Sequence, residues 1–458
     1  MTEPVGLGRL LFDHPFGRDE ILVHTSETSL TKAQVIGRVE SLAEKIAPFQ
    51  GGLRPVAVVA DGLDALIAMF AVWVTEGVFV PVNPRQPRAA IDAVIARSGA
   101  SAIVTGASAQ GGPGDAVHAS GSAFILWTSG TTGAPKPILH SHGAYLEIID
   151  RVLGPLSVRR DDSKAPTPNL IPLSMALNAG IYNALFGLRA GAPLVLMHRF
   201  ATGEFASLVG EHQIRSTVLP PAAIAMLNDD PDVADLSPLR YVRSITAPLS
   251  PFHARRFTAR FGAFVLNGYG QAELGEVIGW TAQDAKDHPD KIGAVGRPHP
   301  GVEVRIDDAD GNGVGELLVK PPTELSATVV EGLGDRIEAD GFVRTGDLAR
   351  LDDGWVWIEG RVGDLINRGG NKVFPDEVEE VLVSLAGVRE AAVVGVAHER
   401  LGQVPVAYVV GDVSDEELDR TCRANLVAYK VPVRFEQVDS LPRNEAGKLL
   451  RRMLLEET

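Results

Sequence analysis

The residues with the clearest capacity for chemistry lie between positions 128 and 136. In order they are Thr128, Ser129, Gly130, Thr131, Thr132, Gly133, Ala134, Pro135 and Lys136. An apolar run over 123–127 precedes them and predicts a buried strand, and a helix is expected to begin near Ser141. Glycines let the backbone approach a ligand closely, N–H and hydroxyl groups donate hydrogen bonds, and the lysine supplies positive charge. The pattern therefore predicts a loop that binds a polyphosphate.

Two alternatives to a phosphate loop carry less weight. A flexible linker rich in glycine, serine and threonine rarely follows a buried strand directly or ends in Pro-Lys. The common P-loop has Gly-Lys followed at once by serine or threonine, whereas Lys136 lies between Pro135 and Pro137. The loop is therefore expected to hold phosphates differently from a P-loop.

A second glycine-rich stretch follows an apolar strand at 264–273. Tyr269 lies between Gly268 and Gly270, so its ring can lie flat against a purine. Glu273 next to a phosphate site would repel the phosphates, and this predicts a Mg²⁺ ion between them. A tight turn with a solvated glutamate is the alternative for this stretch taken alone.

Two further charged residues follow turns. Asp347 comes directly after Thr345 and Gly346, where a carboxylate can accept hydrogen bonds from two sugar hydroxyls, although a local Asx-turn is the alternative. Lys448 follows Gly447 near the C-terminus, where an exposed turn can bring its charge into a cleft of another domain. A solvated basic tail is the alternative there.

Strand and helix patterns alternate through residues 1–261, which predicts an α/β fold with mostly parallel sheets covered by helices. Short strands with turns follow at 291–358. Residues 361–458 show both strand and helix patterns, which predicts a small α+β domain. The predicted domains are 1–360 and 361–458.

Composition excludes several classes of protein. The 458 residues carry a formal net charge of −15, which argues against nucleic-acid binding and against binding to an anionic membrane. The single cysteine, Cys422, excludes disulfides within the chain and cysteine-rich zinc sites. We expect no signal peptide and no membrane span, and therefore a cytoplasmic protein. The oligomeric state does not follow from the sequence.

Five stretches together resemble the adenylate-forming superfamily, and within it the acyl-CoA synthetases. The stretches are 128–136, 267–273, 345–347, 360–379 and 442–451, with Val-Pro-Val-Asn-Pro at 80–84 in addition. The resemblance implies a large N-terminal adenylate-forming domain and a small mobile C-terminal domain. It also implies a two-step reaction, in which a carboxylate attacks the α-phosphorus of ATP to give acyl-AMP and pyrophosphate. The thiol of coenzyme A then displaces AMP.

The resemblance implies a role for individual residues of the nucleotide site. Lys448 would neutralise charge between the carboxylate and the α-phosphate, Glu273 would hold Mg²⁺, and Asp347 would hold the ribose with Arg361 close by. Adenine would lie against Tyr269 and Asn267, in the loop that includes Gly268 and Gly270. The β- and γ-phosphates would be held by the loop listed above, from Thr128, Ser129, Gly130, Thr131, Thr132 and Gly133 to Lys136.

The resemblance also implies a hinge, a tunnel and an acyl pocket. The small domain would rotate about Gly363 and Asp364, withdrawing Lys448 and bringing Gly369 and Gly370 to the pantetheine tunnel. The acyl pocket would draw on the residues after Glu273 and on Met175, Asn178, Ala179, Tyr182 and Ala247. No carboxylate lies in 173–178, where amino-acid-activating relatives carry an aspartate, so the expected substrate is a carboxylic acid without an α-amino group.

Three departures from the family pattern stand out: Pro137 replaces a glycine, Ala272 replaces a threonine, and Met175 lies where a histidine segment is usual. The Ala272 change removes a hydrogen bond worth about 1–3 kcal/mol. Glu276 is a second acid near the pocket; it could favour a hydroxylated substrate, but a solvated position is preferred here. Beside a coenzyme A ligase, two alternatives stay open, namely a ligase that loads a carrier protein and a degenerate nucleotide-binding protein.

Overall fold

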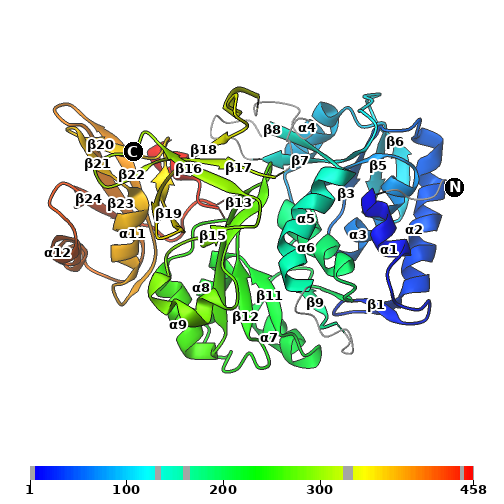
Figure 1. The fold of residues 1–458 in the computed structure, drawn as a ribbon, viewed down its shortest axis with the longest axis horizontal. Helices are drawn as coiled ribbons and strands as arrows, with labels where there is room; N and C mark the ends of the chain where they lie inside the picture. Colours follow the sequence, from blue (N-terminus) through cyan, green and yellow to red (C-terminus); the bar gives the residue numbers. More distant parts are fainter. Residues whose placement is uncertain (1–5, 129–135, 158–165, 323–333, 444–447, 457–458) are drawn as a thin grey trace.

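The fold is taken from a computed structural model that describes residues 6–128, 136–157, 166–322, 334–443 and 448–456. Four sheets follow one another along the molecule (Figure 1), with the N-terminal sheet at one end and the C-terminal sheet at the other. The predicted α/β class is confirmed, with mostly parallel sheets in the larger part and a smaller C-terminal part.

The first sheet has six strands in the order β6-β5-β3-β4-β7-β8. Its parallel strands are joined by helices, as the alternating pattern predicted. Thr31 and Gln34 form a capping box at the start of α2, as the Thr-x-x-Gln spacing predicts. The elements of residues 6–157 are α1 Arg9–Phe12, β1 Ile21–His24, β2 Ser29–Thr31, α2 Lys32–Ile46, β3 Pro55–Val59, α3 Gly62–Val74, β4 Val78–Val82, α4 Arg88–Ser98, β5 Ala102–Thr105, β6 Ser108–Gly111, β7 Ser122–Thr128, β8 Lys136–Ser141 and α5 His142–Ser157, of which β1 and β2 belong to the second sheet.

Two strands of this sheet were not predicted. Residues 106–122 are rich in glycine, alanine and serine and predict a surface loop, but Ser108–Gly111 pairs with β5 as strand β6. The chain was expected to go from the phosphate loop to a helix, but β8 comes first and pairs antiparallel with β7. Both are edge additions whose polar or proline-containing sequences lack a strand pattern.

The second sheet has nine strands in the order β15-β14-β13-β12-β11-β9-β10-β1-β2. Its central strands are parallel, and β13–β15 form an antiparallel extension. Ser250 caps α9 as predicted, since its side chain accepts a hydrogen bond from the Phe252 N–H. The elements are β9 Asn169–Ile171, α6 Asn178–Arg189, β10 Leu194–Leu196, α7 Thr202–Glu211, β11 Ser216–Leu219, α8 Pro221–Asp229, β12 Tyr241–Ser244, α9 Pro251–Phe261, β13 Phe264–Gln271, β14 Gly275–Gly279, α10 Asp284–Asp287 and β15 Arg297–Pro298.

The third sheet is antiparallel and has four strands in sequence order. In it Asp347 of β18 lies directly opposite Arg361 of β19. This register brings two predicted site residues together. The strands are β16 Glu303–Asp307, β17 Gly315–Lys320, β18 Val343–Asp352 and β19 Trp355–Arg361.

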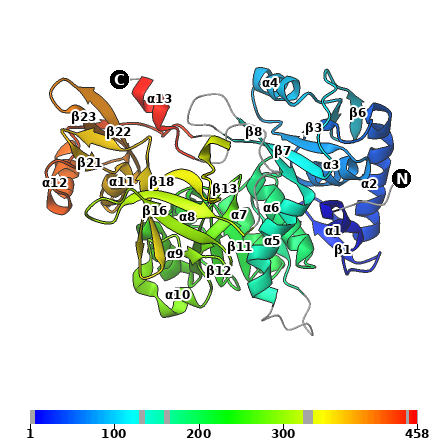
Figure 2. The ribbon, with the colours of Figure 1, turned by 45° about the horizontal axis from the view of Figure 1, so that its top comes forward.

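The C-terminal sheet has five strands and is mostly antiparallel. Gly369 and Gly370 join β20 to β21 with φ values of 59° and 89°, so the bend at the double glycine is confirmed. Figure 2 shows α13 at the far end of the tail, beyond β22. The elements are β20 Ile366–Arg368, β21 Asn371–Val373, α11 Pro375–Val383, β22 Val388–His398, β23 Gly402–Gly411, α12 Asp415–Asn425, β24 Arg434–Gln437 and α13 Arg451–Glu456.

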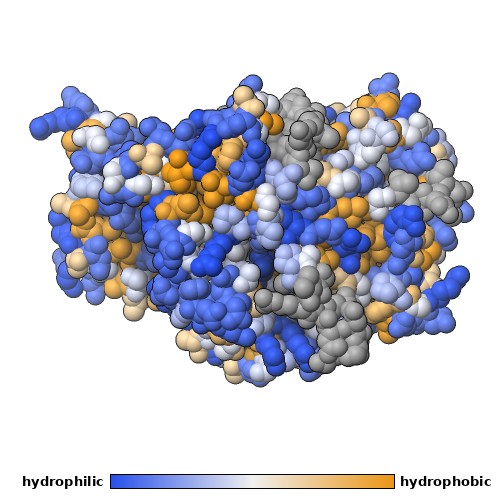
Figure 3. Space-filling view, in the orientation of Figure 1, coloured by the Kyte–Doolittle hydropathy of each residue, from blue (hydrophilic) through white to orange (hydrophobic). Residues whose placement is uncertain are grey.

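The surface is mixed in character. Figure 3 shows hydrophilic residues over most of one face, with apolar residues gathered in separate patches. Among the helices of the described ranges, none is long and apolar enough to cross a membrane.

Candidate active site

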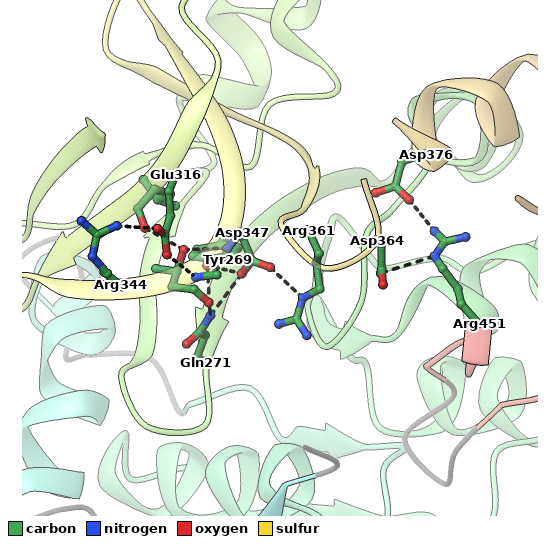
Figure 4. Close-up of polar contacts among 12 residues, drawn as sticks. Tyr269, Gln271, Glu316, Arg344, Asp347, Arg361, Asp364, Asp376 and Arg451 are labelled. Atoms are coloured by element: carbon green, nitrogen blue, oxygen red, sulfur yellow. Dashed lines mark hydrogen bonds and ion pairs between the residues drawn. The ribbon is translucent and has the colours of Figure 1, made fainter. Parts of the chain in front are cut away.

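Asp347 is the centre of the best-defined polar site. Its carboxylate is buried, with 5% of the residue exposed, and Oδ2 accepts a hydrogen bond of 2.6 Å from the Tyr269 hydroxyl. Arg361 Nε donates to Oδ1 at 2.7 Å, opposite across the sheet (Figure 4). Tyr269, Asp347 and Arg361, which the sequence assigned to one nucleotide site, therefore lie together.

Two residues that the sequence did not point to complete this site. Gln271 Nε2 donates to the Thr345 carbonyl at 2.8 Å and to Asp347 Oδ2 at 3.1 Å. Arg336 Nη2 donates to Gln271 Oε1 at 2.5 Å. The Thr345 hydroxyl donates to the Leu317 carbonyl at 2.7 Å, which anchors the turn before Asp347 to the neighbouring strand. The orientation of the carboxylate is thus set by the protein before any ligand binds.

Protonation in this site follows from burial and neighbouring charge. Burial raises the pKa of Tyr269, and the negative charge of Asp347 raises it further, so the phenol stays protonated and donates. Burial alone would lower the pKa of Arg361, but Asp347 opposes this and the net direction is upward. Arg361 therefore remains charged near neutral pH.

Lys448 of the C-terminal tail lies within electrostatic range of this site. Burial lowers its pKa, Arg361 lowers it further, and the carboxylates of Asp347 and Asp364 act in the opposite direction. Asp347 and Arg361 lie in the third sheet, whereas Lys448 belongs to the C-terminal tail. The tail therefore reaches from the small C-terminal part towards the nucleotide residues. The side chain is neither fully buried nor fully exposed.

The ends of the predicted phosphate loop form a hairpin. Thr128 at the end of β7 pairs with Lys136 at the start of β8. Ser129, Gly130, Thr131, Thr132 and Gly133 lie outside the described residues. Lys136 is exposed at the strand end.

The second glycine-rich stretch lies in β13 and the turn after it. Asn267 is half-buried; its Oδ1 accepts from the Gly268 N–H at 3.1 Å, and its Nδ2 lies 3.5 Å from the Ala294 carbonyl. Gly268 and Gly270 pair with β14. A Cβ on Gly270 would overlap the Gly275 backbone, so only glycine fits there.

Glu273 is a suitable ligand for the Mg²⁺ ion that ATP brings. Its side chain is 16% exposed, and Oε1 lies 3.5 Å from Arg336 Nη1. The described residues contain no group of three or more histidine, cysteine, aspartate or glutamate side chains suited to a metal. One carboxylate completed by phosphate oxygens and waters is the usual Mg²⁺ environment, so the donor set fits.

The hinge residues adjoin a second arginine cluster. Gly363 and Asp364 are exposed between β19 and β20. Arg451 Nε lies 3.6 Å from Asp364 Oδ2, and its Nη2 lies 2.6 Å from Asp376 Oδ1 (Figure 4). Arg451 also binds Glu379 of the same helix as Asp376. Burial, together with the charge of Glu379, raises the pKa of Asp376 to about 7 despite Arg451.

The predicted tunnel residues lie apart from the nucleotide residues. Gly369 and Gly370 form an exposed turn in the C-terminal sheet. They are not among the residues that contact Asp347 in the described part of the chain.

The predicted acyl-pocket residues cluster around α6. Met175 is buried, with 1% exposed, and its N–H donates to Asp61 Oδ1 at 2.7 Å. Asn178 Oδ1 accepts a 2.7 Å hydrogen bond from Tyr145. The remaining members are half-buried, namely Ala179, Tyr182 and Ala247.

Glu276 corrects one expectation. The sequence favoured a solvated position, but the side chain is only 7% exposed. Its Oε1 is held by Arg243 and lies 2.9 Å from His299 Nε2. The partners come from β12 and from the segment after β15, so the sequence around Glu276 gave no sign of them.

The family profiles and the individual relatives both place this chain among the AMP-binding enzymes. The profile described as AMP-binding enzyme matches residues 108–327, and that of the AMP-binding enzyme C-terminal domain matches residues 377–448. The long-chain-fatty-acid–CoA ligase FadD13 of Mycobacterium tuberculosis is 30% identical over 73% of this chain and 67% of its own length. The 2-succinylbenzoate–CoA ligase of Bacillus licheniformis is 30% identical over 74% of this chain and 71% of its own length.

A solved structure extends the similarity to nearly the whole fold. The amide bond synthetase McbA from Marinactinospora thermotolerans superimposes with a TM-score of 0.82 and 25% identity, covering 98% of this chain and 99% of that one. The matched residues include the third sheet, which carries Asp347, and the C-terminal part, which carries Lys448. The resemblance drawn from the motifs is confirmed, and the chain belongs to the AMP-binding enzyme family of adenylate-forming ligases.

Proposed function

We propose that this adenylate-forming ligase converts a carboxylic acid without an α-amino group into its coenzyme A thioester. ATP and the acid first give acyl-AMP and pyrophosphate, and coenzyme A then displaces AMP. The observation that supports this most is the meeting of Lys448 with the Tyr269–Asp347–Arg361 site. A cation from the tail then lies beside the position expected for the ribose and α-phosphate of ATP.

The first step requires two anions to approach each other. The Lys448 ammonium would stabilise the charge that builds up where the carboxylate oxygen attacks the α-phosphorus. Asp347 would accept hydrogen bonds from the ribose hydroxyls, and Tyr269 and Arg361 would keep it in place. Groups held in place in this way lower the reaction barrier more than the same groups free in water would.

The phosphates need their own partners. Lys136 and the hydroxyl and N–H groups of 128–133 would hold the β- and γ-phosphates, and Glu273 would hold the Mg²⁺ ion. When bound, the ion would neutralise part of the phosphate charge and favour departure of pyrophosphate. Asn267 and the glycines beside Tyr269 would line the adenine site.

The second step needs a different placement of the small domain, 361–458. Rotation about Gly363 and Asp364 would withdraw Lys448 and bring Gly369 and Gly370 towards the acyl group, where they would line the path of the pantetheine arm. The strand bounds support a hinge here, since β19 ends at Arg361, β20 begins at Ile366, and Gly363 and Asp364 lie between the two strands.

The absence of an α-amino group from the substrate rests on the environment of 173–178. Asp61 supplies a carboxylate that contacts this window, and the protein uses both of its oxygens. They bind the Met175 N–H at 2.7 Å, the Gly62 N–H at 2.8 Å, the Ser174 hydroxyl at 2.9 Å and Arg85 at 2.7 Å. These four contacts occupy the carboxylate, so Asp61 is not expected to bind a substrate ammonium.

The test is acid-dependent release of pyrophosphate across a panel of carboxylic acids, with and without coenzyme A. Formation of acyl-CoA and AMP, identified by mass spectrometry, would support the proposal. Pyrophosphate release followed by transfer only to a carrier-protein thiol would identify a carrier-loading ligase instead. No acid-dependent pyrophosphate with any acid would contradict the proposal and favour a degenerate nucleotide-binding protein.

A further inference from the structure

A buried polar cluster lies next to the proposed acyl pocket. Its members are Glu276 of β14, Arg243 of β12, His299 after β15 and Tyr182 of α6. The side chains of Glu276, His299 and Arg243 are only 7%, 11% and 17% exposed. Arg243 is fixed at both ends, because its second amino group donates to the Trp280 carbonyl at 3.0 Å.

This cluster borders the nucleotide loop directly. A Cβ on Gly268 would lie 3.1 Å from the carboxyl carbon of Glu276. Gly268 immediately precedes Tyr269, the residue whose hydroxyl binds Asp347. We therefore expect an acid whose carboxylate lies between Lys448 and the α-phosphate to extend past Gly268 towards the Glu276 carboxylate.

One polar atom of the cluster is buried and has no hydrogen-bond partner in the described part of the chain, namely the Tyr182 hydroxyl. The contacts of Glu276 with Arg243 and His299 both use Oε1 of its carboxylate. An unpaired polar atom away from water costs free energy, so such atoms at a binding site indicate the groups that a ligand brings.

The protonation of the two groups fixes what each can do. Burial, and then the charge of Glu276, raise the pKa of Tyr182, so its hydroxyl remains a donor. Burial alone would raise the pKa of Glu276, but Arg243 and His299 more than offset it, so the carboxylate remains an acceptor. The effect of Glu276 on Tyr182 also indicates that the two groups are close together.

The net charge of the cluster limits which functional group a ligand can place there. Arg243 is paired with Glu276, and Arg151 on α5 is paired with Glu147 at 2.5 Å. Arg151 also donates to the Leu274 carbonyl at 2.9 Å, which places this second pair beside the same strand. Two positive and two negative groups cancel, so the cluster offers hydrogen bonds without attracting a charged group.

We propose that the substrate is a carboxylic acid with a hydroxyl group at its far end, which donates to Glu276 and accepts from Tyr182. This inference rests on the proposed function, since it assigns the substrate class of the same acyl pocket. An acid with only an apolar end would leave the Tyr182 hydroxyl unpaired and would desolvate the Glu276 carboxylate. Sites built to bind a substrate hydroxyl discriminate strongly against the analogue without it.

The experiment compares matched acids that differ by one hydroxyl. The probes are hexanoate with 6-hydroxyhexanoate, octanoate with 8-hydroxyoctanoate, and 3-phenylpropanoate with 3-(4-hydroxyphenyl)propanoate. The measured quantity is kcat/KM for acid-dependent pyrophosphate release by the full chain. We expect the hydroxylated member of at least one pair to be favoured by about tenfold or more.

Two variants test the assignment of the preference. Tyr182→Phe removes only the unpaired oxygen, so the preference is expected to fall about tenfold, through slower turnover of the hydroxylated acid and faster turnover of its partner. Glu276→Gln is expected to reduce the preference as well. Tyr241→Phe is the control, because Tyr241 stacks on Phe264 and, although it lies two positions before Arg243 on β12, makes none of the cluster contacts given above, so the preference should stay unchanged.

The outcomes separate the two proposals. Equal use of both members of every pair, or a preference that Tyr182→Phe leaves unchanged, would overturn the inference while the ligase activity stands. No pyrophosphate with any acid would instead overturn the proposed function. If a variant folds poorly, calorimetric binding of the matched acyl sulfamoyl adenosines to the unmodified chain gives the same comparison without turnover.

Discussion

Two arginines lie on either side of the hinge and hold carboxylates in different ways (Figure 4). Arg361 contacts Asp347 at 2.7 Å, and the two residues face each other in one antiparallel sheet. Arg451 contacts Asp376 at 2.6 Å and Asp364 at 3.6 Å, residues that belong to a helix and to the hinge. The first pair lies within one sheet, whereas the second joins the tail to the segment about which it would turn.

The difference indicates separate tasks for two similar ion pairs. Both partners of the Arg361 pair lie in the third sheet, before the proposed hinge at Gly363 and Asp364, where the pair would orient a carboxylate for a ligand. The Arg451 cluster fixes where the tail leaves that domain, only three positions after Lys448. Substitutions on the two sides should therefore affect different measurements.

The largest expected effect is that of Lys448→Ala, at the point where both arginines act. Adenylate formation should fall about a thousandfold, because the charge that develops between the carboxylate and the α-phosphate loses its stabilising cation. Conversion of preformed acyl-AMP to thioester should be nearly unchanged. Single-turnover assays of each half-reaction measure both, with Arg452→Ala as the neighbouring control. Equal loss in both half-reactions would remove Lys448 from its assigned role.

Arg451→Met should act on stability. It leaves the half-buried carboxylates of Asp376 and Glu379 without their cation, which costs about 2 kcal/mol in the free energy of unfolding. Urea unfolding of the full chain measures this, and Arg451→Lys should restore part of it. Arg361→Met should instead change the KM for ATP more than the unfolding midpoint. If the two arginine variants behave alike in both assays, the comparison fails.

Tyr269→Phe tests the ribose side with a smaller change. Loss of the 2.6 Å hydrogen bond to Asp347 should cost about 1 kcal/mol, seen as a roughly fivefold higher KM for ATP. Gln271 still donates to the same oxygen, which limits the effect. Tyr241→Phe serves again as the control, and an unchanged KM would show that the phenol does not position the carboxylate.

The smallest effect concerns pH. The pKa of Asp376 is raised to about 7, so between pH 4 and 7 the folded chain keeps a proton that the unfolded chain releases. The contribution of Asp376 to stability therefore falls as pH rises through this window. Asp376→Asn cannot ionise, so its unfolding free energy should change less across the window, by under about 1 kcal/mol relative to the unmodified chain. Parallel pH profiles would contradict this.

The sequence was informative wherever a motif is local. Tyr269, Asp347 and Lys448 each follow or adjoin a glycine turn, and they meet in space as the motifs implied. It was silent where partners are distant. Arg336 reaches Gln271 across 65 positions, and Arg243 reaches Glu276 across 33. A charge next to a motif looks solvated until the strand that neutralises it is known, and this is why the burial of Glu276 was missed.

The pairing of Asp347 with Arg361 has a mechanical consequence. The strand pairing of β18 with β19 ends at that pair, the Val362 N–H still donates to the Gly346 carbonyl at 3.0 Å, and the proposed hinge at Gly363 and Asp364 follows. If the small domain turns about those two residues, the Asp347–Arg361 pair lies outside the part that moves. The small domain could then exchange Lys448 for the double glycine near the acyl group while the residues proposed to bind AMP keep their geometry.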